Sequence, residues 1–192
     1  MASKKKLAST FPNMVIVMTV VALTSALALS LTNISTLKAR QMVEVKRTLE
    51  ALKEVLPEFD NDPNKEKYSV EDYAEMEFYP AKKEGQPVGT AIKTYSDKGF
   101  SERIWLLVGF DGGNKVHNIA VLKQRETPGL GTKMKEPKFR NQFTGKDPTT
   151  FKLKVKKDGG AVDAITAATI SSRAFCDAVS KAYRALIKGG KK

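Results

Sequence analysis

The spacing of hydrophobic residues differs from one segment of the chain to the next, and each spacing predicts a different element. The segment from Phe11 to Leu37 contains no charged residue and is built mostly from Val, Ile, Met, Leu and Ala. As a helix it would reach roughly 40 Å, which is enough to cross a bilayer. Residues 11–37 are therefore predicted to form a transmembrane helix, preceded by residues 1–10.

A cleaved signal peptide is the alternative for this segment. Lys4-Lys5-Lys6 resembles a basic leader, and Ala26-Leu27-Ala28 offers a cleavage site. The apolar run continues beyond Ala28 as Leu29-Ser30-Leu31, which favours an uncleaved anchor. Positive charges flank both ends of the segment, so the positive-inside rule does not fix its orientation.

A second helix is predicted between the membrane segment and the folded domain. From Arg40 to Leu56 one face is apolar, with Met42, Val45, Leu49, Leu52 and Leu56. Pro57 ends this pattern, and the polar stretch 60–64 breaks the chain. We therefore expect a connecting helix in residues 38–60 and a folded domain over 61–192. The helix either caps that domain or packs on partner subunits.

Four short apolar segments predict an antiparallel sheet, at residues 75–79, 88–95, 102–110 and 116–123. Asp111-Gly112-Gly113-Asn114, between the last two segments, is a strong hairpin signal. The segment 104–108 is nearly all apolar, as in a strand covered on both faces. Trp105 is expected in the core, with stacking on a cofactor as the alternative.

The last third of the chain predicts three further elements. Phe139 and Phe143 indicate a short helix or a structured lid. Residues 151–156 alternate apolar residues with lysines, which predicts a strand. From Phe175 onward the spacing is that of an amphipathic helix, with apolar residues at Phe175, Ala178, Val179, Ala182, Leu186 and Ile187. Lys188-Gly189-Gly190 should end that helix.

These elements predict an α+β fold, with an N-terminal transmembrane helix followed by one domain that has an antiparallel sheet and a C-terminal helix. The chain has 33 Lys and Arg against 21 Asp and Glu, a net charge of +12. Basic and aromatic residues do not interleave, so no nucleic-acid partner is expected. A solvated lysine-rich surface explains the charge, and docking on acidic subunits or lipid headgroups is the alternative. One His and one Cys predict neither a metal site nor an intrachain disulfide, and Cys176 is expected to be an inert thiol.

Small and hydroxyl-bearing residues gather from Asp163 to Ser172, where the last helix is expected to begin. Unpaired N–H groups and the positive end of the helix dipole suit such a place to an anionic oxygen or a phosphate. The alternative is simple capping, in which Thr166, Thr169 or Ser171 bonds a first-turn amide.

The order Asp-x-x-Thr-Ala-Ala-Thr, from Asp163 to Thr169, resembles the flavinylation motif Asp-x-x-(Ser/Thr)-Gly-Ala-Thr. The resemblance implies that Thr169 carries FMN through a phosphodiester bond, installed by an external FMN transferase. Asp163, Thr166 and Ala168 would belong to the same site. Ala167 stands where the motif usually has Gly, and at positive φ an alanine would cost roughly 1–2 kcal/mol.

A second motif, from Glu126 to Lys133, reads Glu-Thr-Pro-Gly-Leu-Gly-Thr-Lys. It resembles the loop of FMN-binding domains in the G subunit of Rnf complexes, and in the C subunit of the sodium-pumping NADH:quinone oxidoreductase. The resemblance implies that the loop lies beside the flavin ring and contributes Glu126, Thr127, Gly129, Leu130 and Gly131.

The Rnf resemblance also implies a function. The chain would carry electrons in a membrane complex that couples ferredoxin and NAD chemistry to ion translocation, without binding those substrates itself. Its partners would be the other Rnf subunits, the FMN transferase during maturation, and membrane lipid. It would cross the inner (cytoplasmic) membrane once, with residues 1–10 in the cytoplasm and the domain outside. A free-standing membrane-anchored flavin reductase and a non-redox sensor or scaffold are the alternatives.

Overall fold

The computed structural model describes residues 10–189. The chain divides into two compact units, Met1–Lys46 and Arg47–Lys192, and we describe each by itself. Most of the predicted cytoplasmic segment 1–10, including Lys4 to Lys6, lies outside the described residues, as does Gly190.

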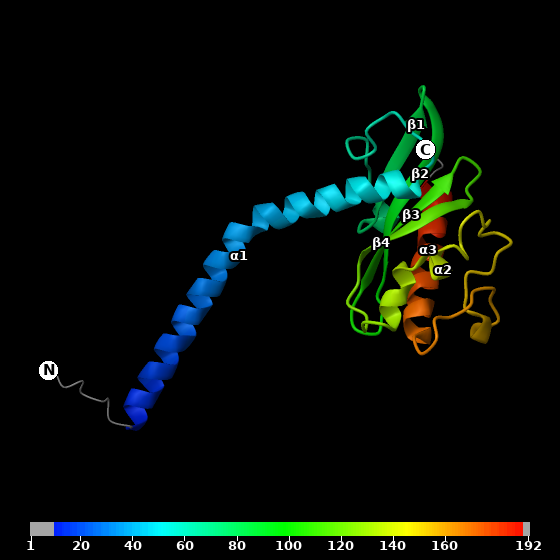
Figure 1. Cartoon of the computed structure of the whole chain (residues 1–192). Helices are drawn as coiled ribbons and strands as arrows, with labels where there is room; N and C mark the ends of the chain where they lie inside the picture. The colour runs from blue at the N-terminus through cyan, green and yellow to red at the C-terminus, as the bar shows by residue number, and fades with distance from the viewer. Residues whose placement is uncertain (1–9, 190–192) are drawn as a thin grey trace. The chain divides into compact units, whose positions relative to one another are not determined.

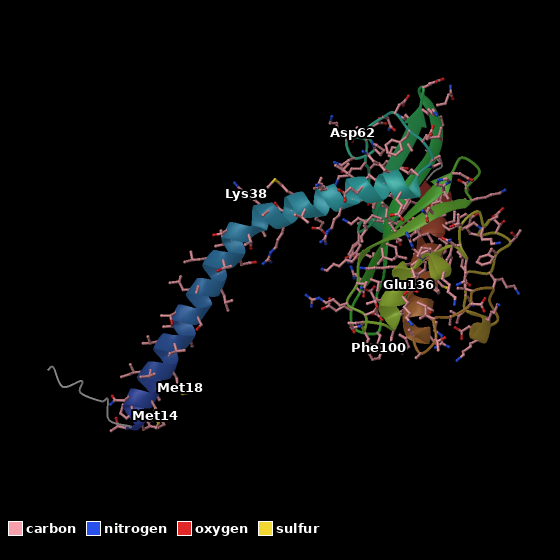
Figure 2. The ribbon with its side chains drawn as sticks, in the orientation of Figure 1. Met14, Met18, Lys38, Asp62, Phe100 and Glu136 are labelled. Atoms are coloured by element: carbon pink, nitrogen blue, oxygen red, sulfur yellow. The ribbon has the colours of Figure 1, made fainter. Side chains whose placement is uncertain are left out.

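Helix α1, Phe11–Val55, begins in the first unit and is long and apolar enough to cross a membrane. The apolar side chains of the part of α1 in the first unit are exposed, among them Met14 and Met18 (Figure 2). Four hydroxyls of this stretch, those of Thr24, Thr32, Ser35 and Thr36, donate to carbonyls one turn back; Thr24 donates to Val20 at 2.9 Å and Thr32 to Ala28 at 2.8 Å. These bonds satisfy the four hydroxyls within the helix, as a hydrocarbon environment requires.

The predicted connecting helix is not a separate element. Helix α1 continues without a break through residues 38–55, and it ends at Val55, two residues before Pro57. The charged residues after Leu37 suit this part of the helix to water and not to lipid, but they do not interrupt its backbone hydrogen bonds. Proline does interrupt them, because it lacks an N–H.

The second unit contains a four-stranded antiparallel sheet in the order β1-β2-β3-β4, with helix α3 across one face (Figure 1). The strands are β1, Glu77–Lys83; β2, Gln86–Ser96; β3, Ile104–Asp111; and β4, Val116–Lys123. All four predicted strands are present, and the predicted fold class is confirmed. Strand β2 begins at Gln86 and Pro87, two residues before the predicted segment 88–95.

The hairpin between β3 and β4 forms where the Asp-Gly-Gly-Asn signal predicted it. The Asp111 carboxylate accepts bonds from the N–H groups of Gly113 and Lys115, both at 2.9 Å. Asn114 adopts the left-handed conformation, with φ of 62°, which asparagine tolerates better than most residues. The turn is therefore stabilised by the residue types that mark it in the sequence.

One face of the sheet packs against α3, Thr169–Gly189. The predicted apolar face of this helix is correct at five positions, since Phe175, Ala178, Val179, Ala182 and Leu186 are buried. Ile187 is the exception and is 40% exposed. From the sheet, the buried partners include Phe78, Ile92, Leu106, Val108 and Phe110.

The opposite face of the sheet packs against the last turns of α1. Leu52, Val55 and Leu56 are buried there, in one cluster with residues of all four strands: Tyr79, Ala81, Ala91, Leu107 and Ala120. This end of α1 therefore caps the domain, one of the two roles expected for it, and the second unit begins before residue 61. Three residues of the predicted apolar face remain exposed, namely Met42, Val45 and Leu49.

Gly109 allows α1 to approach the sheet closely. A Cβ at this position would lie 1.8 Å from the Val55 carbonyl oxygen, which is far inside any contact distance. Side chains reinforce the contact: Arg140 donates to the Glu54 carboxylate at 2.6 Å and to the Ile119 carbonyl at 2.7 Å. The helix end is thus held by backbone proximity and by a charged hydrogen bond.

Trp105 does not lie in the core as expected. It is half-buried, its ring centre lies 5.2 Å from that of Tyr95, and the Arg103 guanidinium lies 5.5 Å from the Trp105 ring centre. Its neighbours in β3, Ile104, Leu106, Leu107 and Val108, are fully buried as predicted.

Residues 151–156 do not form the predicted strand. The alternating burial is present, but only an isolated bridge joins Val155 to Val162. The hydrogen bonds of this segment go instead to a local turn, for example from Val162 to Lys154 at 3.0 Å. The predicted short helix near Phe139 is correct, since α2 spans Pro137–Arg140 and follows the 3-10 helix η2, Gly131–Lys135.

The contact at Gly109 yields a test of the α1 docking. Gly109→Ala should destabilise the full-length protein in detergent by about 1–3 kcal/mol, because the added methyl group displaces the end of α1. Thermal unfolding followed by circular dichroism measures the change. Gly112→Ala is the matched control, since its Cβ would meet nothing closer than the Val88 carbonyl at 3.9 Å. Equal stability of the two variants would contradict the docking.

Candidate functional site

The two sequence motifs converge on one pocket, although they lie far apart in the chain. The pocket has a volume of about 350 Å³, and we call it the loop–helix pocket. It is lined by residues of the loop before η2, of the first turn of α3, and by one residue of the β2–β3 connection: Phe100, Glu126, Thr127, Leu130, Gly131, Ala167, Ala168, Thr169, Ile170 and Ser171.

The loop side of the pocket is shaped by a tight turn. The Thr127 carbonyl accepts the Leu130 N–H at 3.1 Å, and Gly129 has a φ of 74°, which favours glycine. Gly129 donates its N–H to the Thr132 hydroxyl at 3.0 Å. Among residues 10–189, the Thr127 hydroxyl has no hydrogen-bond partner, so its side chain is not what holds the turn.

Glu126 joins three segments around the pocket and is only 4% exposed. One carboxylate oxygen accepts the N–H groups of Phe100 at 2.9 Å and Ser101 at 3.3 Å. The other accepts the hydroxyl of Ser171 in the first turn of α3. Within the described part of the chain, no Lys, Arg or His forms an ion pair with this carboxylate.

Gly131 lets the loop approach α3. A Cβ at this position would lie 2.5 Å from the Ser171 hydroxyl oxygen and 2.7 Å from the Cβ of Glu126. Any side chain would therefore separate the loop from the helix and open the bond between Glu126 and Ser171. The glycine of the motif is explained by this contact.

Thr169 is the first residue of α3, and its hydroxyl is uncommitted. It is half-buried, and neither it nor the Thr166 hydroxyl has a hydrogen-bond partner among residues 10–189. Ser172 instead fastens the preceding loop, accepting the Ile165 N–H at 2.9 Å and donating to the Ala168 carbonyl at 3.0 Å. The capping alternative therefore finds no support at Thr166 or Thr169.

The backbone at the start of α3 offers free donors. In the described chain, the N–H groups of Thr169, Ile170 and Ser171 have no acceptor, and the first bond of the helix runs from Ser172 to Ala168 at 3.0 Å. Three N–H groups and the positive end of the dipole of a 21-residue helix thus lie at residues that line the pocket. This combination stabilises a bound anion.

Ala167 adopts the left-handed conformation, with φ of 59°. Residue 167 therefore does have a positive φ, and the alanine at this position carries a strain of roughly 1–2 kcal/mol. Glycine would adopt the same conformation without that strain.

Three predicted site residues, Asp163, Thr166 and Gly129, do not line the loop–helix pocket. Asp163 and Thr166 line a neighbouring hollow of about 410 Å³ with Lys133, Lys138, Phe139 and other residues. The Asp163 carboxylate pairs with Lys156 at 2.7 Å, and its backbone is held by the Gln142 side chain, which accepts the N–H at 2.8 Å. Asp163 therefore fixes the loop that leads to Thr169. Gly129 shapes the turn without lining the pocket.

Sequence reasoning missed Phe100 and Ile170 as residues of the pocket, and it missed the bond from Ser171 to Glu126. Phe100, labelled in Figure 2, is 64% exposed, Ile170 is 47% exposed and Leu130 is 39% exposed. Together these side chains form an apolar rim on the loop–helix pocket. No local pattern marks Phe100, but exposed apolar residues that meet at a pocket indicate a partly apolar ligand.

Cys176 lies further along α3 and is buried in the core. Burial raises the pKa of its thiol to about 12. A thiol in this state is inert at neutral pH, as the sequence predicted.

Comparison with known proteins identifies similar chains. A family described as FMN-binding domain matches residues 99–184. The G subunit of the ion-translocating oxidoreductase complex of Yersinia pestis is 41% identical over 143 residues, covering 68% of each chain. The G subunit of the ion-translocating oxidoreductase complex of Vibrio cholerae is 34% identical over 182 residues, covering 87% of this chain and 86% of that protein. The G subunit of the Na(+)-translocating ferredoxin:NAD(+) oxidoreductase complex of Acetobacterium woodii is 31% identical, covering 86% of each chain.

Among solved structures, the fold is similar to that of the C subunit of the Na(+)-translocating NADH-quinone reductase from Parabacteroides distasonis. The TM-score is 0.52, with 24% sequence identity over 71% of this chain and 72% of that one. The similarity concerns the arrangement of the sheet and the helix.

The strain at Ala167 can be measured directly. Ala167→Gly should stabilise the protein by about 1 kcal/mol, because the gain from removing left-handed strain exceeds the extra entropy of glycine in the unfolded chain. Chemical denaturation in detergent gives the difference. Ala164→Gly, in the same loop and outside the positive-φ residues, is the control and should destabilise. A loss of stability in both variants would show that Ala167 is not strained.

Proposed function

Because the chain belongs to the family of G subunits of ion-translocating oxidoreductase complexes, we propose that it is the FMN-carrying electron carrier of such a membrane complex. The observation that supports this most directly is the convergence of the two flavin-related motifs on the loop–helix pocket. The apolar helix α1 would anchor the protein, and the other subunits of the complex and membrane lipid would be its partners.

The residues of the pocket fit FMN in three respects. Its volume of about 350 Å³ lies within the range of small-molecule sites. The apolar rim of Phe100, Leu130 and Ile170 would cover the faces of a planar ring. The free N–H groups at the start of α3 would hold a phosphate. The pocket thus has one part that suits the phosphate of FMN and another that suits its ring.

The attachment would be covalent, through the Thr169 hydroxyl. A transferase would move the FMN phosphoryl group from FAD to the Thr169 oxygen, with AMP as the leaving group and the hydroxyl proton released. The phosphodiester keeps one negative charge, which the helix start stabilises. The free hydroxyl of Thr169 supports this assignment, since no hydrogen bond of the fold is lost on modification.

The protein's contribution is to hold and orient the group. A bound flavin supplies the electron-transfer chemistry. Glu126 and Gly131 keep the loop against α3, and Gln142 fixes the segment of chain that leads to the attachment residue. Thr127 leaves its hydroxyl free at the pocket. The covalent bond would keep the carrier in place in both oxidation states.

Thr169→Val tests the attachment. The variant keeps the shape of the side chain and removes the hydroxyl, so in-gel flavin fluorescence of the denatured protein should fall to background. In the unaltered protein, the peptide that contains Thr169 should be heavier by FMN less one water. Thr144→Val, at an exposed threonine outside the pocket, is the control and should retain full fluorescence. Fluorescence in Thr169→Val would place the flavin elsewhere.

We also propose that α1 stays attached and that the domain lies outside the cytoplasm, a sidedness that rests on the family resemblance alone. Protease added to intact spheroplasts should then digest the domain and leave a small membrane-bound fragment. The same treatment of inside-out vesicles is the control and should spare the domain. A mature N-terminus just after Ala28 would instead identify a cleaved signal peptide.

A further inference from the structure

The carboxylate of Glu126 is a buried charge that the fold leaves without a cation among residues 10–189, although the chain as a whole carries a net charge of +12. Burial of an ion is costly unless the ion is paired or fully hydrogen-bonded. The Glu126 carboxylate is hydrogen-bonded, and its three donors belong to Phe100, Ser101 and Ser171. The structure therefore retains a negative charge at the wall of the loop–helix pocket.

Two glycines make room for this carboxylate. A Cβ on Gly99 would lie 3.0 Å from one carboxylate oxygen, and a Cβ on Gly131 would lie 2.9 Å from the other. Gly99 lies in the β2–β3 connection, and Gly131 is the first residue of η2. Two separate segments thus have a glycine where a side chain would collide with the Glu126 carboxylate. The space on both sides of the carboxylate is reserved for it.

We propose that Glu126 is a potential-setting residue, whose fixed negative charge lowers the reduction potential of the group held in the loop–helix pocket. This inference rests on the proposed function. An electron that enters the pocket adds negative charge beside the carboxylate, and the two repel each other. In the described chain no cation is paired to Glu126, so that repulsion is weakened by its three hydrogen-bond donors and by the positive end of α3, but not by an ion pair.

The charge and the hydrogen bonds can be separated by two substitutions. Glu126→Gln removes the charge and keeps every bond, since its carbonyl oxygen accepts the N–H groups of Phe100 and Ser101. Its amide then donates to Ser171, whose hydroxyl accepts as readily as it donates. Glu126→Asp keeps the charge, but its side chain is one methylene shorter and does not span the distance to all three donors.

The experiment is a redox titration of the flavin-loaded, full-length protein in detergent, followed by flavin absorbance. In Glu126→Gln the equilibrium constant for one-electron reduction should rise roughly tenfold, the scale of one unit charge at about 10 Å in a medium of intermediate dielectric. For a one-electron couple this is a rise of about 59 mV. Glu126→Asp should keep a potential close to that of the unaltered protein.

Thr127→Val is the matched comparison on the same loop, because it removes a polar group without changing the charge. If its free hydroxyl stabilises the reduced group, the equilibrium constant should fall about fivefold, which corresponds to about 40 mV. Neighbouring substitutions are therefore expected to move the potential in opposite directions, which a general loosening of the pocket does not produce.

Unfolding of the flavin-free protein supplies a second readout. Glu126→Gln should unfold at nearly the denaturant concentration of the unaltered protein, whereas Glu126→Asp should unfold earlier. An unchanged potential in Glu126→Gln would overturn the inference and leave Glu126 with a purely structural role, while the proposed function stands. If Glu126→Gln does not fold, Glu126→Asp still tests the inference. A raised reduction potential in Glu126→Asp, which keeps the charge, would overturn it. An unaltered protein that carries no flavin would refute the proposed function and this inference together.

Discussion

Strand β3 is packed on both faces by helices from opposite ends of the chain, and the rest of the domain depends on this arrangement. Leu106, Val108 and Phe110 face α3, while Leu107 faces the end of α1 and Gly109 admits the α1 backbone. Because β3 is buried on both faces, neither helix can move without exposing apolar surface. The first turn of α3 is consequently fixed near the loop that follows β4, and the loop–helix pocket forms between them.

Much of this fold follows from local patterns in the sequence. The strands, the Asp-Gly-Gly-Asn hairpin and the apolar face of α3 were predicted because alternation, turn chemistry and helical spacing are determined over short stretches. Residues 151–156 show the limit of such patterns. Their alternating burial was predicted correctly, but alternation does not reveal where the backbone bonds go, and these residues bond to their own turn. The sequence does not predict that α1 is uninterrupted, because the change in composition after Leu37 resembles the end of a helix.

The site was only partly predictable for a related reason. The motifs identified Thr169 and the loop from Glu126 to Gly131, and both line one pocket. Their contact, the bond between Glu126 and Ser171, joins residues that are 45 positions apart, and no local signal reports it. Phe100 was missed because an exposed phenylalanine in a connection has no periodicity to mark it. The strain at Ala167 depends on its φ, and no pattern in the sequence reports that angle.

The division of labour among the hydroxyls at the start of α3 bears on the order of maturation. Ser171 and Ser172 make the bonds that fix the helix start, and Thr169 makes none among the described residues. Among the described residues the fold thus uses no hydrogen bond of the Thr169 hydroxyl, and a modification of that oxygen removes none. If FMN is attached at Thr169 as proposed, the modifying enzyme would act on a domain that is already folded. Folding and attachment would then be separate steps, and the hydrogen bonds of the helix start would be the same before and after attachment.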